Sequence, residues 1–167
     1  EEPERLAEIK GISLKKAVDI SNQLIEKRDM RRAMIYMQDY GISMKLANKI
    51  FMHYGQDIYT VIKENPYKLA DDIEGVGFKI ADDIARKVGI KSDSEFRIKS
   101  GIYYCLCQAV SMGHVYIPLE ELENQVKSLL LIDIQDFDKY IMDLSIDKKI
   151  VVREIEGRQC VYAAMYY

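Results

Sequence analysis

The sequence predicts a mainly α-helical protein, in which helix pairs joined by tight turns precede a smaller α+β region with a β-hairpin. Two observations predict this fold class. A ten-residue pattern occurs three times in the first half, and each copy opens with a glycine that can end a helix. After Asp93 the pattern stops, and short strand patterns alternate with helical ones. We therefore expect two domains, residues 1–93 and residues 94–167.

Composition excludes several classes of protein. No apolar run approaches the roughly 18 to 20 residues that span a bilayer, and the N-terminus has no signal-peptide pattern. The spacing of the three cysteines and two histidines matches neither a disulfide framework nor a zinc site, so we expect free thiols and no metal site. Free thiols indicate a reducing compartment, and we expect a cytoplasmic location in a bacterial-type cytosol or nucleoid. The chain starts without Met, and we expect it to be a piece of a longer protein.

The repeated pattern is Gly, β-branched, small, apolar, Lys, any residue, Ala, any two residues, Ile. It occupies residues 11–20, 41–50 and 75–84, so the copies begin 30 and 34 residues apart. This spacing leaves room for two or three short helices per copy. The hairpins are expected near residues 11–13, 41–43 and 75–77.

The third copy has the clearest helix boundaries. Asn65-Pro66 is a good N-cap and first position for a helix that ends before Gly75. A second helix is expected from Phe78 to Val88, where Gly89 ends it. Its predicted buried stripe, spaced four residues apart, consists of Ile80, Ile84 and Val88, with Ala81 beside it to allow close helix packing. Gly55 is expected to end the corresponding helix of the second copy in the same way.

Such a turn is suited to bind an anion. The first amides of a helix have no partner within the helix and carry the positive end of its dipole. Gly75 and Gly77 keep side chains away from these amides, while Val76 can anchor the turn in the core. Lys79 can add a cation beside the same phosphate. A contact of this kind reaches only the DNA backbone and carries no sequence information.

The candidate DNA-binding residues follow from the three copies. In the first two copies serine replaces the second glycine and is a good N-cap, so structural capping is an alternative to phosphate contact. Likewise, the glycines could simply make tight turns and the lysines could simply be solvated. The candidates are Gly75, Val76, Gly77, Phe78 and Lys79 in the third copy, Gly41, Ser43 and Lys45 in the second, and Gly11, Ser13 and Lys15 in the first.

These residues resemble a known family. Ile73-Glu74-Gly75-Val76-Gly77-Phe78-Lys79-Ile80-Ala81 resembles the helix-hairpin-helix signature. Tyr40-Gly41-Ile42-Ser43, the stretch from Glu64 to Lys79, and Gly113-His114-Val115-Tyr116-Ile117-Pro118 resemble the region ahead of the motor in RecD/TraA-type ATP-dependent DNA helicases, which include the exodeoxyribonuclease V α-subunit.

The resemblance implies a parent protein that is a 5′-to-3′ helicase of DNA repair or recombination. The expected partners are duplex, forked or junction DNA, the parent's own motor domains and other repair proteins, with no membrane. ATP and Mg²⁺ are expected only in those motor domains, and this chain is expected to hold no cofactor.

The second half has the element order of a winged helix-turn-helix. The pattern predicts a helix over 94–112, a strand over 115–117 closed by Pro118, helices over 119–131 and 136–147, and a hairpin over 149–155 and 159–164 that turns at 156–158. The would-be recognition helix is acidic, carrying Asp136, Asp138, Asp143 and Asp147, and carboxylates repel phosphates. A docking or scaffold role is therefore favoured, with backbone contact through Arg153 and Arg158 as the alternative. The tyrosines of this half are expected to pack in the core or between domains.

Residues 1–93 carry 16 acidic and 16 basic side chains, and residues 94–167 carry 11 and 8, so any DNA contact has to be local. The sequence has no Gly-rich loop ending in Gly-Lys-Ser/Thr, so ATP hydrolysis is not expected. Adjacent acidic residues such as Asp71-Asp72 and Asp82-Asp83 point in different directions on a helix, so metal-dependent cleavage is not expected either. The leading hypothesis is a non-catalytic accessory module that binds DNA without reading sequence. The alternative is a protein-interaction or interdomain module with no direct DNA contact.

Overall fold

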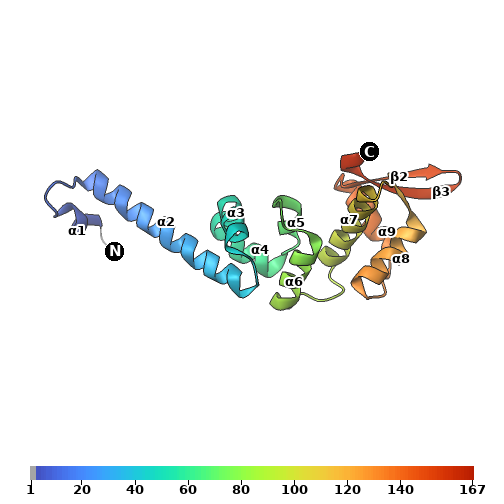
Figure 1. Ribbon diagram of the computed structural model, residues 1–167, viewed down its shortest axis with the longest axis horizontal. Helices are drawn as coiled ribbons and strands as arrows, with labels where there is room; N and C mark the ends of the chain where they lie inside the picture. Colours follow the sequence, from blue (N-terminus) through green and yellow to red (C-terminus); the bar gives the residue numbers. More distant parts are fainter. Residues whose placement is uncertain (1–2) are drawn as a thin grey trace. The chain divides into compact units, whose positions relative to one another are not determined.

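The computed structural model describes residues 3–167 of the chain (Figure 1). Contacts divide the chain into two compact units, Glu1–Lys63 and Glu64–Tyr167. The third copy of the repeat therefore packs with the residues that follow it. The sequence pattern predicted a domain boundary between residues 93 and 94. Whether residues 94–167 fold independently stays a prediction.

The first unit is helical. It contains α1 (Pro3–Ala7), α2 (Leu14–Asp39), α3 (Met44–Tyr54), the short 3₁₀ helix η1 (Gly55–Asp57) and α4 (Ile58–Glu64). As predicted, Gly55 ends α3, with a φ of 55°.

Helix α2 is shared by the first two copies of the repeat. It follows the first hairpin and precedes the second, and it runs unbroken for 26 residues (Figure 1). No glycine or proline interrupts residues 14–39, so nothing divides the segment into the shorter helices that the repeat spacing had allowed. Helix α2 packs on α1 and on α3, and its buried residues are Ala17 and Ser21 near its start and Ala33 and Met37 near its end.

The second unit begins with the helix pair of the third copy, α5 (Lys68–Asp72) and α6 (Phe78–Val88). The predicted order of the second half follows and is confirmed: α7 (Glu95–Ser111), β1 (Ile117–Pro118), α8 (Leu119–Leu130), α9 (Phe137–Ile146), β2 (Ile150–Ile155) and β3 (Arg158–Ala163), then a 3₁₀ turn, η2 (Ala164–Tyr166). The described residues are thus mainly α-helical with one small antiparallel sheet, which confirms the predicted fold class.

The sheet has the strand order β1-β3-β2. The hairpin between β2 and β3 turns at Glu156-Gly157, whose φ values of 50° and 76° are those of a type I′ turn. Pro118 belongs to β1 rather than closing it, which is possible because β1 lies at the edge of the sheet. Helices α7 and α8 pack on β3, and one apolar face of α7 is buried: Ile98, Ile102, Cys105 and Ala109.

Two local expectations are wrong. Ile80 is exposed, because the buried face of α6 passes instead through Phe78, Ala81, Ile84 and Ala85. The side chain of Asn65 does not cap α5, whose N-cap position is Tyr67; the Asn65 Oδ1 is buried without a hydrogen-bond partner.

No helix within residues 3–167 has both the length and the apolar composition needed to cross a membrane. The same residues contain no group of three His, Cys, Asp or Glu side chains that could hold a metal ion.

Candidate nucleic-acid interface

The three hairpins have the same backbone conformation at their first glycine. The φ angles of Gly11, Gly41 and Gly75 are 99°, 81° and 99°, in the left-handed region that favours glycine. At the second hairpin the Gly41 N–H donates to the Gln38 carbonyl at 2.9 Å, and the Ile42 N–H donates to the Met37 carbonyl at 3.2 Å. This pair of bonds is a Schellman motif, which ends α2 and turns the chain into α3.

Burial alternates along each hairpin in the way that phosphate access requires. The first and third residues of every hairpin are exposed. The central apolar residue points inward: Ile42 and Val76 are buried, and Ile12 is half-buried. The prediction that Val76 anchors its turn is confirmed, because only 4% of its surface remains accessible.

The repeated alanine lies at the contact between the paired helices. Ala17, Ala47 and Ala81 are each fully buried. A larger side chain would separate the helices, since buried sites tolerate little added volume.

The start of the helix after each hairpin differs between copies. Ser13 accepts a hydrogen bond from the Lys16 N–H at 3.3 Å, and Ser43 accepts one from the Leu46 N–H at 3.4 Å. Gly77 has no side chain to do this, and no side-chain bond caps α6. The third hairpin therefore leaves more of its first-turn amides available, and the space beside Gly77 is open for 4 Å where a Cβ would project.

The lysine of the pattern is the second residue of the helix in each copy. Lys15, Lys45 and Lys79 are all exposed, and none of them forms an ion pair with any residue from 3 to 167. Phe78, also a candidate, is buried, so it can offer only its backbone amide.

The third hairpin lies in a unit of opposite net charge to the unit that contains the first two hairpins. A boundary at residue 93 does not show this difference. Residues 1–63 contain 11 basic and 9 acidic side chains, net +2, whereas residues 64–167 contain 13 and 18, net −5. The third hairpin belongs to the acidic unit and follows Asp71, Asp72 and Glu74. Lys149 pairs with Asp71 at 2.6 Å and offsets part of this charge.

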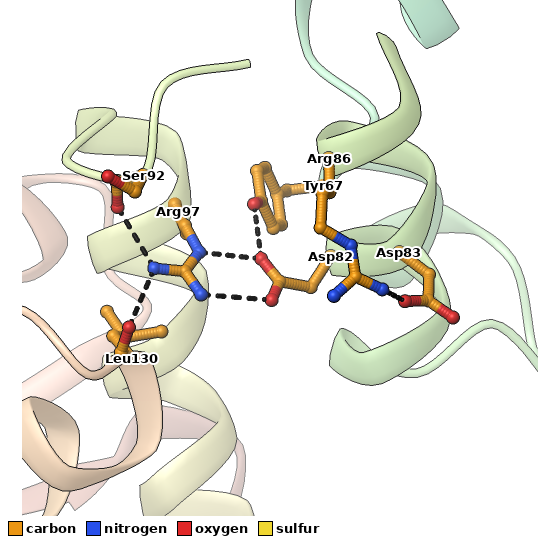
Figure 2. Close-up of polar contacts among 7 residues, drawn as sticks. All are labelled: Tyr67, Asp82, Asp83, Arg86, Ser92, Arg97 and Leu130. Carbon is orange, nitrogen blue, oxygen red and sulfur yellow. Dashed lines mark hydrogen bonds and ion pairs between the residues drawn. The ribbon is translucent and has the colours of Figure 1, made fainter. Parts of the chain in front are cut away.

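A polar network joins the third helix pair to the following helices, as Figure 2 shows. Arg97 of α7 holds the Asp82 carboxylate of α6 with two bonds: Nε donates to Oδ1 at 2.8 Å and Nη2 to Oδ2 at 3.1 Å. The Tyr67 hydroxyl donates to the same carboxylate at 2.6 Å. The Arg97 Nη1 also donates to the carbonyl oxygens of Ser92 and Leu130, each at 3.0 Å.

The network shifts the ionisation of its members. Partial burial raises the pKa of the Asp82 carboxyl, but hydrogen bonds from Arg97 and Tyr67 outweigh it and hold that pKa below its ordinary value. Burial and the bond to Asp82 raise the pKa of Tyr67. Asp82 is therefore a carboxylate at neutral pH, paired with the Arg97 guanidinium, and Tyr67 donates to it as a neutral hydroxyl.

No local pattern marks Arg97 as a structural residue, because its partners Asp82 and Leu130 lie 15 and 33 positions away. The predicted tyrosine packing is observed for several residues: Tyr104 lies 5.3 Å from the Phe78 ring, and Tyr162 lies 5.4 Å from Tyr116 and 5.2 Å from Tyr167. Arg153 and Arg158, the candidates for backbone contact, are both exposed. The Arg153 Nε donates a hydrogen bond to the Tyr167 hydroxyl at 2.9 Å.

The sequence of this chain is similar to those of known proteins. The family model described as the ATP-dependent RecD2 DNA helicase HHH domain matches residues 26–116, which include the second and third hairpins but not the first. The ATP-dependent RecD2 DNA helicase of Deinococcus radiodurans is 23% identical over 127 residues, which cover 75% of this chain and 18% of that protein. Because the family match extends over more than half of the chain, the chain belongs to the family of RecD2 DNA helicase helix-hairpin-helix domains.

Proposed function

We propose that this chain is a DNA-binding accessory region of an ATP-dependent DNA helicase of repair or recombination, and that it binds the phosphate backbone without reading sequence. The observation that carries the proposal is the exposure of the third hairpin. Gly75 and Gly77 are open to solvent, Val76 is anchored in the core, and no side chain caps α6.

Binding follows from the helix start. The open amides of Phe78, Lys79 and Ile80 donate to one phosphate, and the dipole of α6 and the Lys79 ammonium add positive charge. The hairpins at Gly11, Ser13 and Lys15 and at Gly41, Ser43 and Lys45 contribute weaker contacts, because each serine already occupies one amide. With two to four phosphates bound, affinity is weak and falls with salt with a logarithmic slope of about −2 to −4.

The chain contributes no catalysis in this proposal. ATP and Mg²⁺ bind in the motor of the parent helicase, and tethering to that motor converts a weak DNA contact into an effective one. Such a parent acts in the cytoplasm.

Residues 94–167 have a separate role in this proposal, as a winged-helix-like brace for the motor or for a partner. The acidic α9 supports this role, since Asp138 and Asp143 lie on the helix that would otherwise face DNA. Asp143 is held by Lys99 at 2.9 Å. The acidity of residues 64–167 also favours the second candidate function, an interdomain module without DNA contact.

Charge reversal of the hairpin lysines tests the proposal. Fluorescence anisotropy with a 20-base-pair duplex should show at least about tenfold weaker binding for the triple variant Lys15→Glu, Lys45→Glu, Lys79→Glu, with Lys79→Glu the largest single effect. The salt slope should become smaller in magnitude by about one for each of these lysines that contacts a phosphate. Lys63→Glu is a control, because Lys63 is equally exposed but lies outside the hairpins.

Two duplexes of unrelated sequence should bind alike. If the unaltered chain binds neither duplex at low salt, the interdomain role replaces the DNA-binding role.

A further inference from the structure

The long helix α2 has a surface that the hairpins do not use. Its buried residues are Ala17 and Ser21 near the start and Ala33 and Met37 near the end, whereas residues 22–28 are all exposed. Since the middle of α2 is not needed for packing within the described residues, its side chains are free to meet a partner.

One row of residues along α2 carries cations and no carboxylate, although Asp19 and Glu26 lie on the neighbouring row. Residues spaced three or four apart lie on one face of a helix. One such row consists of Lys16, Ile20, Gln23, Lys27, Arg31, Met34 and Gln38, which we call the cationic stripe. The four carboxylates of α2, Asp19, Glu26, Asp29 and Asp39, lie off this row.

The three cations of the stripe are available. Lys16, Lys27 and Arg31 are exposed, and none of them forms an ion pair with another residue in the range 3–167. By contrast, Arg28 lies off the stripe and contacts Asp29 at 3.6 Å.

The stripe runs from the first hairpin to the second. At one end the Lys16 N–H is the amide bonded by Ser13 of the first hairpin. At the other end Lys27, Arg31 and Gln38 line a shallow groove together with Met44, the first residue of α3 after the second hairpin. The remaining lining residues are Met30, Met34 and Ile35.

The length of α2 matches the repeat of a duplex. Its 26 residues span about 39 Å at about 1.5 Å per residue. One turn of B-form DNA spans about 34 to 36 Å. Phosphates at the two hairpins would therefore lie about one turn apart, on the same face of a duplex that follows the helix.

We infer that the cationic stripe of α2 binds the sugar-phosphate backbone of duplex DNA and joins the first two hairpins into one contact surface about a helical turn long. This inference rests on the proposed DNA-binding function and names its substrate as duplex DNA. The groove beside Met44 would also suit an acidic amphipathic helix, but it covers only the last turns of α2, whereas the cations continue to Lys16.

The helix itself supplies a matched control. Lys27→Glu with Arg31→Glu reverses two charges on the stripe. Arg28→Glu with Arg32→Glu makes the same change in net charge about 100° around the helix. Because all four residues are exposed, both variants should fold, and circular dichroism checks this.

We expect the stripe variant of the full chain to bind a 20-base-pair duplex about tenfold more weakly than the unaltered chain, with a salt slope lower by about two. The control variant should stay within about twofold, since charges more than about 8 Å from a phosphate are largely screened at physiological salt. Affinity of the unaltered chain should rise between 8 and 16 base pairs by more than the number of overlapping sites explains.

Equal binding by the two variants would overturn the inference. If the hairpin-lysine variants still lose affinity in that case, the proposed function stands and the groove is left to a protein partner. If the unaltered chain binds no duplex, the proposed function itself fails.

Discussion

Single side chains decide how firmly the third hairpin is held. Asp82 lies three residues after Lys79 on α6, and its carboxylate is held by Arg97 and Tyr67. The accessible fraction of the side-chain surface is 16% for Arg97 and 27% for Asp82, so water screens this pair less than it screens a pair on the surface. We infer that the pair fixes the direction of α6, and with it the direction of the hairpin amides.

Removing this charge should destabilise the protein in a pH-dependent way. Because the folded-state pKa of Asp82 is depressed, its stabilising effect is present above the unfolded pKa of about 3.9 and is lost as pH falls through the folded value. Asp82→Asn should therefore lower the unfolding free energy by about 1 to 3 kcal/mol at pH 7. The deficit should shrink at about pH 3 in urea titrations.

The neighbouring Asp83 provides the comparison for that prediction. Asp83 pairs with Arg86 on the surface, where both side chains are more than half exposed. Asp83→Asn should change stability by less than about 1 kcal/mol. Equal effects of the two substitutions would contradict a structural role for Arg97.

At the level of the helix pair, the two glycines of the third hairpin meet two different requirements. Gly75 has a φ of 99°, which a residue with a Cβ adopts at a cost of about 1 to 2 kcal/mol. Gly77 has a φ of −92° and a ψ of 174°, an extended conformation open to any residue. The first glycine is therefore needed for the turn, and the second keeps the amides uncovered.

Substitutions at the two glycines should have opposite effects. Gly75→Ala should lower the unfolding free energy by about 1 to 2 kcal/mol in urea titrations. Gly77→Ser should leave stability unchanged or raise it by a few tenths of a kcal/mol, because serine can accept the Ile80 N–H as Ser13 accepts that of Lys16. The same Gly77→Ser substitution should weaken duplex binding several-fold in the anisotropy assay. Unchanged affinity would mean that the Ile80 amide does not contact phosphate.

At the scale of the whole chain, contacts and charge divide the sequence at the same place. The first unit ends at Lys63, and net charge changes from +2 to −5 at that position. The third copy of the repeat thus has the same hairpin geometry as the two copies in the first unit, but it packs within the second, acidic unit. We interpret the first unit as the surface that presents two hairpins and the cationic stripe to DNA, and the second unit as the part that presents the third hairpin, the strongest single contact in the proposed function.

Truncation distinguishes the contact boundary from the one predicted by sequence. Residues 64–167 should unfold cooperatively on their own. Residues 94–167 should melt lower by on the order of 10 °C, since they lose Asp82, Tyr67 and the packing of Phe78 on Tyr104. Thermal unfolding followed by circular dichroism makes the comparison. Equal melting temperatures would support two domains divided after residue 93.

Much of the fold could be predicted from local patterns. The hairpin glycines, the buried alanines and the element order of the second half follow from residues close together in sequence. The errors occur where tertiary contacts compete with such patterns. Ile80 has the helical spacing of a core residue, yet Phe78 takes the buried position, and Asn65 looks like a cap although the helix begins after Tyr67.

Local sequence is sufficient to specify the three hairpins, because a left-handed glycine, an inward apolar residue and a helix start are local requirements. Long-range contacts, in contrast, establish which hairpins share a unit, which carboxylates are neutralised and which face of α2 stays open. Those outcomes depend on groups far apart along the chain, such as Arg97 with the Leu130 carbonyl and Lys149 with Asp71, and no local pattern encodes a contact across that distance.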